Sequence, residues 1–209
     1  MSYALKEIYV TLQGEGAQAG RRAVFARFAG CNLWSGREAD RAMARCRFCD
    51  TDFVGTDGPG GGRFADAAGL ADAVAAAWGD APEHRLVVLT GGEPTLQLDT
   101  ALVAALRARG FAVAVESNGT RPCPEVDWLT ISPKAGTQVV QRRGDELKLV
   151  FPQPGLPPAQ VVGWDFAHFF LQPMDGPEVA ANTRAAAAFC LANPRWRLSL
   201  QTHKLIGLP

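Results

Sequence analysis

Short apolar segments alternate with helical patterns along this 209-residue chain, and this alternation most constrains its fold. The apolar segments are rich in Val, Leu and Phe and are bounded by Gly, Pro or polar residues, as buried parallel strands are. The predicted strands are 24–28, 86–89, 112–115, 128–131, 146–150, 168–171 and 197–200. The predicted helices are 66–78, 96–109 and 178–192. Strands that alternate with helices favour an α/β fold with a parallel sheet.

The lengths of the connections narrow this fold class. Gly110 is suited to end the second helix, and Asn193-Pro194 to end the third. The connections 116–127 and 132–145 are too short for full helices. An open sheet stays an alternative, but a shortened, partial (β/α) barrel fits better than a complete eightfold one, which usually has about 250 residues. We expect residues 1–209 to form a single domain, with ligands at the carboxyl ends of the strands.

Charge and targeting signals limit the partners. The 21 basic residues balance the 21 acidic ones, so the basic excess typical of nucleic-acid binding is absent and a small-molecule partner is expected. The first sixteen residues lack the features of a signal peptide, and no run of about 18 apolar residues predicts a membrane span. The five cysteines are an odd number, which favours metal binding or catalysis in a cytoplasmic protein over disulfides.

Three of the cysteines predict a metal centre. Cys31 follows a predicted strand, and Cys46 and Cys49 form a C-x2-C pair later on the same loop. A structural zinc site is an alternative, but it wants a fourth ligand that this loop does not offer. Three thiolates also suit a [4Fe–4S] cluster with one open iron. Cys123 and Cys190 are interpreted as structural cysteines.

The segment Thr90-Gly91-Gly92-Glu93-Pro94 follows the predicted strand 86–89. Glycines allow the backbone to approach a ligand closely. With the cysteine loop, this turn resembles the radical S-adenosylmethionine superfamily, in which three cysteines bind a [4Fe–4S] cluster and the Gly-Gly-Glu-Pro turn contacts S-adenosylmethionine (SAM). The usual C-x3-C-x2-C spacing would put the middle cysteine at Ser35. Here the loop is longer, so we expect Cys46 to take that role, since the cost of closing a loop grows slowly with its length.

Further segments are similar to one family within it, the 7-carboxy-7-deazaguanine synthases of queuosine and 7-deazapurine biosynthesis. They are the residues 12–16 (LQGEG), 27–33 (RFAGCNL), 49–51 (CDT), 132–134 (SPK), 171–175 (LQPMD) and 201–204 (QTHK). The resemblance implies a lyase that contracts the ring of 6-carboxy-5,6,7,8-tetrahydropterin to give 7-carboxy-7-deazaguanine and ammonia. It also implies SAM, a [4Fe–4S] cluster, Mg²⁺, an electron donor such as flavodoxin, and a homodimer. The alternative is a radical-activating enzyme that acts on a partner protein.

The resemblance also assigns roles to individual residues. Thr51 would bind Mg²⁺, although alone it would be a hydroxyl that caps a turn. The SAM set, which would bind SAM, comprises Phe48, Asp50, Gly92, Glu93, Ser117, Ser132, Pro133, Lys134, Gln172, Pro173, Met174 and Asp175. The pterin set, which would bind the substrate, comprises Leu12, Gln13, Gly14, Glu15, Arg27, Thr90, His203 and Pro209. No side chain is assigned as a catalytic acid or base, because the radical arises at the cluster.

The chemistry of the pterin set suits a carboxylated pterin. Glu15 can accept hydrogen bonds from a guanidine-like edge, and Arg27 can pair with a carboxylate through two N–H groups. The alternatives are a solvated Glu15 and an Arg27 that points away from the site. We expect the tail 201–209 to cross the mouth of the site, with His203 and the terminal carboxylate facing the pterin. Packing on the barrel exterior or in a dimer contact is the alternative for this tail.

Overall fold

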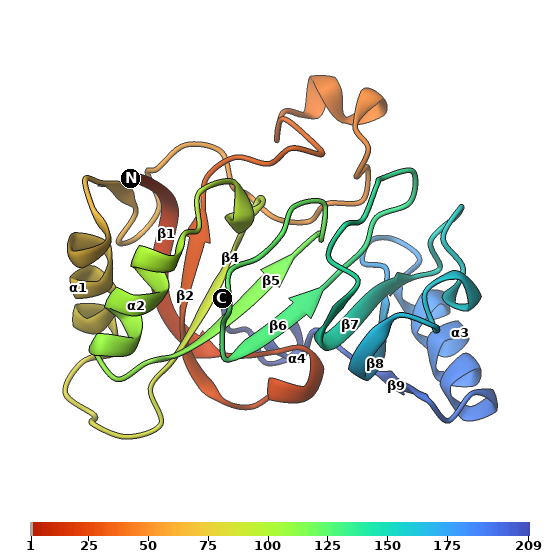
Figure 1. Cartoon of the computed structure of the whole chain (residues 1–209). Coiled ribbons are helices and arrows are strands. Elements are labelled where there is room, and N and C mark those ends of the chain that lie inside the picture. The colour runs from red at the N-terminus through yellow and green to blue at the C-terminus, as the bar shows by residue number, and fades with distance from the viewer. Residues whose placement is uncertain (1) are drawn as a thin grey trace.

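A computed structural model describes residues 2–209 and contains one nine-stranded sheet, ordered β3-β1-β2-β4-β5-β6-β7-β8-β9 (Figure 1). The strands are β1 (Tyr3–Leu12), β2 (Arg22–Phe28), β3 (Gly62–Phe64), β4 (Leu86–Gly91), β5 (Ala112–Ser117), β6 (Trp128–Ile131), β7 (Arg143–Phe151), β8 (Asp165–Pro173) and β9 (Trp196–Leu198). From β2 to β9, all neighbouring strands run parallel, whereas β1 pairs antiparallel with β2 and β3. The sheet does not close on itself, as predicted for a partial barrel and unlike a complete eightfold one.

The helices are α1 (Ala67–Trp78), α2 (Thr100–Ala108), α3 (Val179–Ala192) and α4 (Thr202–Ile206), with short 3-10 helices at Gly16–Gln18, Glu38–Met43, Pro94–Leu96 and Pro158–Gln160. The three helices predicted from sequence are confirmed. Asp66 and Asp99 cap α1 and α2 by accepting hydrogen bonds from backbone N–H groups of the first turn. Neither 118–127 nor 132–142 contains a helix, as predicted.

All seven predicted strands are present, but the sequence analysis did not predict β1, β3 or α4. In β1, a bulge shifts the pairing register between Leu5 and Glu7. Because an extra residue moves the following side chains to the other face, the two-residue alternation that signals a strand is interrupted here. The strand β3 and the helix α4 have only three and five residues, too few for a periodic pattern.

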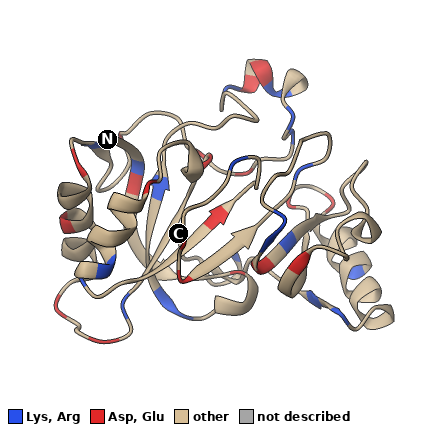
Figure 2. Ribbon diagram, in the orientation of Figure 1, with Lys and Arg blue, Asp and Glu red and all other residues tan. Residues whose placement is uncertain are grey.

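The two faces of the sheet differ in what they bury. On the outer face, α1 packs against β1 and β2, α2 against β5, and α3 against β8 and β9, so the apolar core lies between the helices and the sheet (Figure 1). On the inner face, buried polar residues project from the central strands, and Figure 2 shows acidic and basic positions within them. These inner residues are Thr90, Glu146, Lys148 and Gln172. No helix in the described part, 2–209, is long and apolar enough to cross a membrane.

Candidate active site

One cavity of about 520 Å³ opens at the carboxyl ends of the parallel strands. It is lined by Cys31, Cys46, Cys49 and Thr51, and by every member of the SAM and pterin sets except Glu93, Pro133 and Met174. These residues come from eight segments spread over almost the whole chain. The fold therefore gathers the sequence-predicted residues around one space, although their individual roles stay predictions.

The long cysteine loop is an ordered unit with internal contacts. The backbone N–H of Arg45 donates to the carbonyl of Leu33 at 3.0 Å, so the loop closes on itself and returns Cys46 to the cavity. The Arg41 guanidinium lies 4.0 Å from the Trp34 ring centre and donates to the Cys49 carbonyl at 3.1 Å. Cation–π and charge-assisted contacts of this kind stabilise the loop, and the buried Trp34 ring packs edge-on against Phe53.

The thiols within this loop influence one another. Cys46 and Cys49 lie close enough to interact: their interaction lowers the pKa of Cys49 to about 6 and, together with burial, raises the pKa of Cys46. Cys31 is close enough for its charge to affect Cys46 as well. Ser35 does not line the cavity, because its hydroxyl donates to Asp40 at 2.7 Å. The donor set therefore fits a [4Fe–4S] cluster, which thiolates bind.

The Gly-Gly turn lies directly against the first cysteine. A side-chain carbon built on Gly92 would come within 2.1 Å of the Gly30 carbonyl oxygen and 3.0 Å of Cys31 Cβ. Only glycine allows this approach. Glu93 is fully buried outside the cavity, and its carboxylate accepts hydrogen bonds from Thr95, from the Ser117 hydroxyl and from the Asn118 backbone N–H. Glu93 thus ties the turn to the end of β5.

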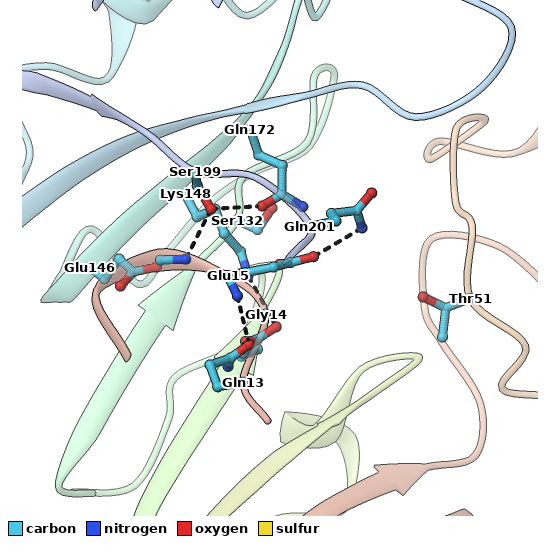
Figure 3. Close-up of polar contacts among 12 residues, drawn as sticks. Gln13, Gly14, Glu15, Thr51, Ser132, Glu146, Lys148, Gln172, Ser199 and Gln201 are labelled. Carbon is cyan, nitrogen blue, oxygen red and sulfur yellow. Dashed lines mark hydrogen bonds and ion pairs between the residues drawn. The ribbon is translucent and has the colours of Figure 1, made fainter. Parts of the chain in front are cut away.

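A buried ion network that the sequence analysis missed lies among the pterin set (Figure 3). Lys148 donates to Glu15, and also to Glu116 at 3.2 Å. Gln13 donates to the same Glu116 at 2.9 Å and accepts from the backbone N–H of Glu15. Burial would raise the pKa of the Glu15 carboxyl, but the charge and hydrogen bond of Lys148, together with glutamine side chains such as Gln201, outweigh burial and lower it. The Glu15 side chain is only 14% exposed and is paired with Lys148, so the alternative of a solvated Glu15 is wrong.

A sequence signal for this network existed. The predicted strand 146–150 reads Glu-Leu-Lys-Leu-Val, with charged residues at alternate positions of an otherwise apolar strand. Alternate residues of a strand share a face, so these two had to project together from a buried sheet. Glu146, two residues before Lys148 on the same strand, accepts a hydrogen bond from the Ala17 backbone N–H at 2.9 Å, and burial raises the pKa of its carboxyl.

Arg27 points into the cavity, so the alternative that it points away is wrong. Its Nε donates to Glu7 at 2.7 Å and one terminal nitrogen donates to the Tyr9 hydroxyl at 2.8 Å. The guanidinium is thereby held by β1. The second terminal nitrogen has no hydrogen-bond partner within the described residues, which leaves the far edge of the guanidinium for a ligand.

The C-terminal tail is anchored on β1 and on the loop after it. The Thr202 backbone N–H and hydroxyl both donate to the Gly14 carbonyl, at 3.0 and 2.9 Å. The His203 ring packs so closely on Gly14 that a side-chain carbon there would lie 2.0 Å from the ring nitrogen. At the end of the tail, the Thr11 hydroxyl donates to Pro209 at 3.0 Å. His203, Leu208 and Pro209 all line the cavity.

Two carboxylates of the SAM set meet a lysine of the tail. The Lys204 ammonium donates to Asp50 and to Asp175, both at 2.6 Å. These hydrogen bonds lower the pKa of both carboxyls, although burial opposes the effect at Asp50. Elsewhere in the set, burial lowers the pKa of Lys134, which donates to the carbonyl and hydroxyl of Ser132 at 2.7 Å.

Thr51 lines the cavity next to Asp50 and lies apart from the ion network in Figure 3. Its hydroxyl is 3.5 Å from a carboxylate oxygen of Asp50, which is too long for a strong hydrogen bond. Across residues 2–209, no three side chains of His, Cys, Asp or Glu converge on a point that one metal ion could occupy. Magnesium bound through Thr51 would need ligand oxygens and waters to complete its shell.

Comparison with known proteins gives the family. No protein-family model matches the chain. A 7-carboxy-7-deazaguanine synthase from Bordetella pertussis is 65% identical over 210 residues, and one from Caulobacter vibrioides is 63% identical over 210 residues; each match covers 100% of both chains. The crystal structure of QueE from Escherichia coli matches with a TM-score of 0.67 at 24% identity, covering 96% of this chain and 94% of that one, which supports the fold. The chain belongs to the 7-carboxy-7-deazaguanine synthase family.

Proposed function

We propose that this chain converts 6-carboxy-5,6,7,8-tetrahydropterin into 7-carboxy-7-deazaguanine with loss of ammonia. The observation that carries the proposal is a single cavity that holds three cysteine thiols, the Gly-Gly turn and the pterin set together. When bound, the [4Fe–4S] cluster and SAM would supply the radical that removes hydrogen from the pterin. Residues 1–209 would act as one domain.

Different residues of the cavity would bind the cluster, SAM and the pterin. Cys31, Cys46 and Cys49 would hold the cluster, and the SAM set would hold SAM beside it. Arg27 would bind the pterin carboxylate through the free edge of its guanidinium, because Glu7 and Tyr9 occupy the other edge. The buried carboxylate network around Lys148 would accept hydrogen bonds from the amino and ring N–H groups of the pterin.

Magnesium and the partners belong to the proposal too. Thr51 would bind Mg²⁺ together with the substrate carboxylate and waters, which suits a hard cation that keeps part of its water shell.

A flavodoxin-type protein would supply the electron. Leu205 and Ile206 of α4 are 74% and 61% exposed, which supports a contact between two copies in a homodimer. The radical-activating alternative has no support among the relatives, which are named as synthases.

The decisive experiment is anaerobic incubation of the reconstituted protein with SAM, a reductant, Mg²⁺ and the carboxylated pterin, followed by mass analysis. We expect 7-carboxy-7-deazaguanine, with a rate that falls when Mg²⁺ is removed. A protein that carries a complete cluster and cleaves SAM, yet forms no deazaguanine, would contradict the proposal.

Replacing Arg27 with lysine should raise the KM for the pterin by about tenfold. Lysine keeps the charge but has one nitrogen instead of a planar fork of three, so it cannot hold Glu7 and Tyr9 on one edge and a carboxylate on another. One charge-assisted hydrogen bond contributes about 1.5 kcal/mol. Steady-state kinetics measure this effect. Arg22→Lys, on the same strand but outside the cavity, is the matched control. A large fall in Tm with normal turnover would show that Arg27 is structural.

Deleting Leu208 and Pro209, or adding a C-terminal tag, should weaken pterin binding while leaving SAM binding and cluster content intact. Both residues line the cavity, and the Thr11 hydroxyl holds Pro209 in place. The deletion removes the terminal carboxylate from that position, and the tag converts it into an uncharged peptide carbonyl. Binding of each ligand is measured by calorimetry under anaerobic conditions. An unchanged kcat/KM in both variants would move the tail out of the site.

A further inference from the structure

Gln201 touches both halves of the cavity. Its side-chain N–H₂ donates to Glu15 of the pterin set at 2.9 Å and to Asp50 of the SAM set at 3.2 Å. Its carbonyl oxygen accepts from Lys204 at 3.0 Å. The Gln201 side chain lies against Glu15 in Figure 3. The orientation of this amide follows from its partners, since two carboxylates face its nitrogen and an ammonium faces its oxygen.

Lys204 extends this contact to the end of β8. An ammonium group has three N–H donors, and here they reach Asp50, Asp175 and Gln201. The backbone that carries both side chains is fixed by the hydrogen bonds from Thr202 to Gly14. The hydrogen bonds therefore run without a break from Asp175 and Asp50 through Lys204 and Gln201 to Glu15.

We propose that Gln201 and Lys204 are positioning residues that link the pterin-binding and SAM-binding carboxylates, so that binding of either ligand strengthens binding of the other. The proposal rests on the function proposed above. Gln201 and Lys204 together form a bridge between these carboxylates. The first ligand to bind fixes its own carboxylate, and through this bridge it orders the carboxylate that receives the second ligand. Coupling between two sites is reciprocal, so each ligand must change the affinity of the other by the same factor.

The test measures this factor by anaerobic calorimetry on the cluster-loaded protein, kept oxidised so that no turnover occurs. The Kd of the pterin is determined with and without saturating SAM, and the Kd of SAM with and without the pterin. We expect a factor of about five or more in the wild type, within the range common for coupled sites. In Gln201→Ala it should fall to near one, while each ligand alone binds within about threefold of the wild type, because neither contact of the amide is to a ligand.

Two further variants separate the bridge from general anchoring of the tail. Lys204→Met removes the charged half of the bridge and should also lower the factor. Thr202→Val removes the hydroxyl's hydrogen bond to Gly14 but keeps that of the backbone N–H, so the Gln201 amide stays in place and the wild-type factor is expected. A wild type without coupling, or Gln201→Ala and Lys204→Met with full coupling, overturns this inference. If the wild type binds SAM but not the pterin, the proposed function fails instead.

Discussion

Replacing Cys46 with alanine should abolish cluster binding and turnover, whereas replacing Ser35 with alanine should change neither. Cys46 lines the cavity and lies close to Cys49, while the Ser35 hydroxyl donates to Asp40 outside the cavity. Since a cluster is held by thiolates, loss of one of only three ligands is not replaced by a distant hydroxyl. Iron and sulfide content after anaerobic reconstitution, with the visible absorption spectrum, measures the effect.

A cysteine outside the cavity provides the control. Cys190 lies on α3 at the far edge of the sheet and does not line the cavity. Cys190→Ala makes the same chemical change as Cys46→Ala, so it should keep full iron content. If Ser35→Ala lost iron while Cys46→Ala kept it, the long loop would not place its cysteine as inferred here.

The sequence predicted the parallel part of the sheet well because those strands are buried on both faces. The strand 128–131 was predicted to the residue, and the observed β7 and β8 run only one to three residues beyond the predicted ends. In β1, the bulge and the charges Lys6 and Glu7 conceal the strand signal. A continuous apolar run can be recognised as a strand from the local sequence, whereas an irregular edge strand cannot.

The positions around the cavity were predictable through the family resemblance, but their contacts with each other were not. Glu15 and Lys148 are 133 residues apart, and Gln201 and Glu15 are 186 apart. Nothing in the local sequence of a glutamate indicates which cation will reach it through the fold. The same limit explains why Gln201 and Lys204, at the start of the short helix α4, were not assigned to the site.

Replacing Lys148 with methionine should destabilise the protein by about 3 kcal/mol and lower its Tm by roughly 10 °C at neutral pH. Lys148 is 5% exposed and pairs with two carboxylates, Glu15 and Glu116. Methionine fills much of the same space but leaves two largely buried carboxylates without a cation, and breaking a buried ion pair is strongly destabilising. Thermal unfolding followed by circular dichroism measures the change. Lys6→Met is the control and should lower Tm far less, because its partners Asp52 and Asp57 are exposed.

The dependence on pH identifies the cause of this loss. In the wild type the pKa of Glu15 is lowered, so its stabilisation is present above the unfolded pKa, near 4.3, and is lost as pH falls through the folded value. Without Lys148, burial raises that pKa, so the variant is penalised increasingly as pH rises above the unfolded value. The difference in Tm should therefore be larger at pH 7.5 than at pH 5. In the double variant Lys148→Met with Glu15→Gln, part of the stability should return, because one uncompensated charge is removed. A Tm difference independent of pH, with no recovery in the double variant, would assign the role of Lys148 to packing of its methylene chain.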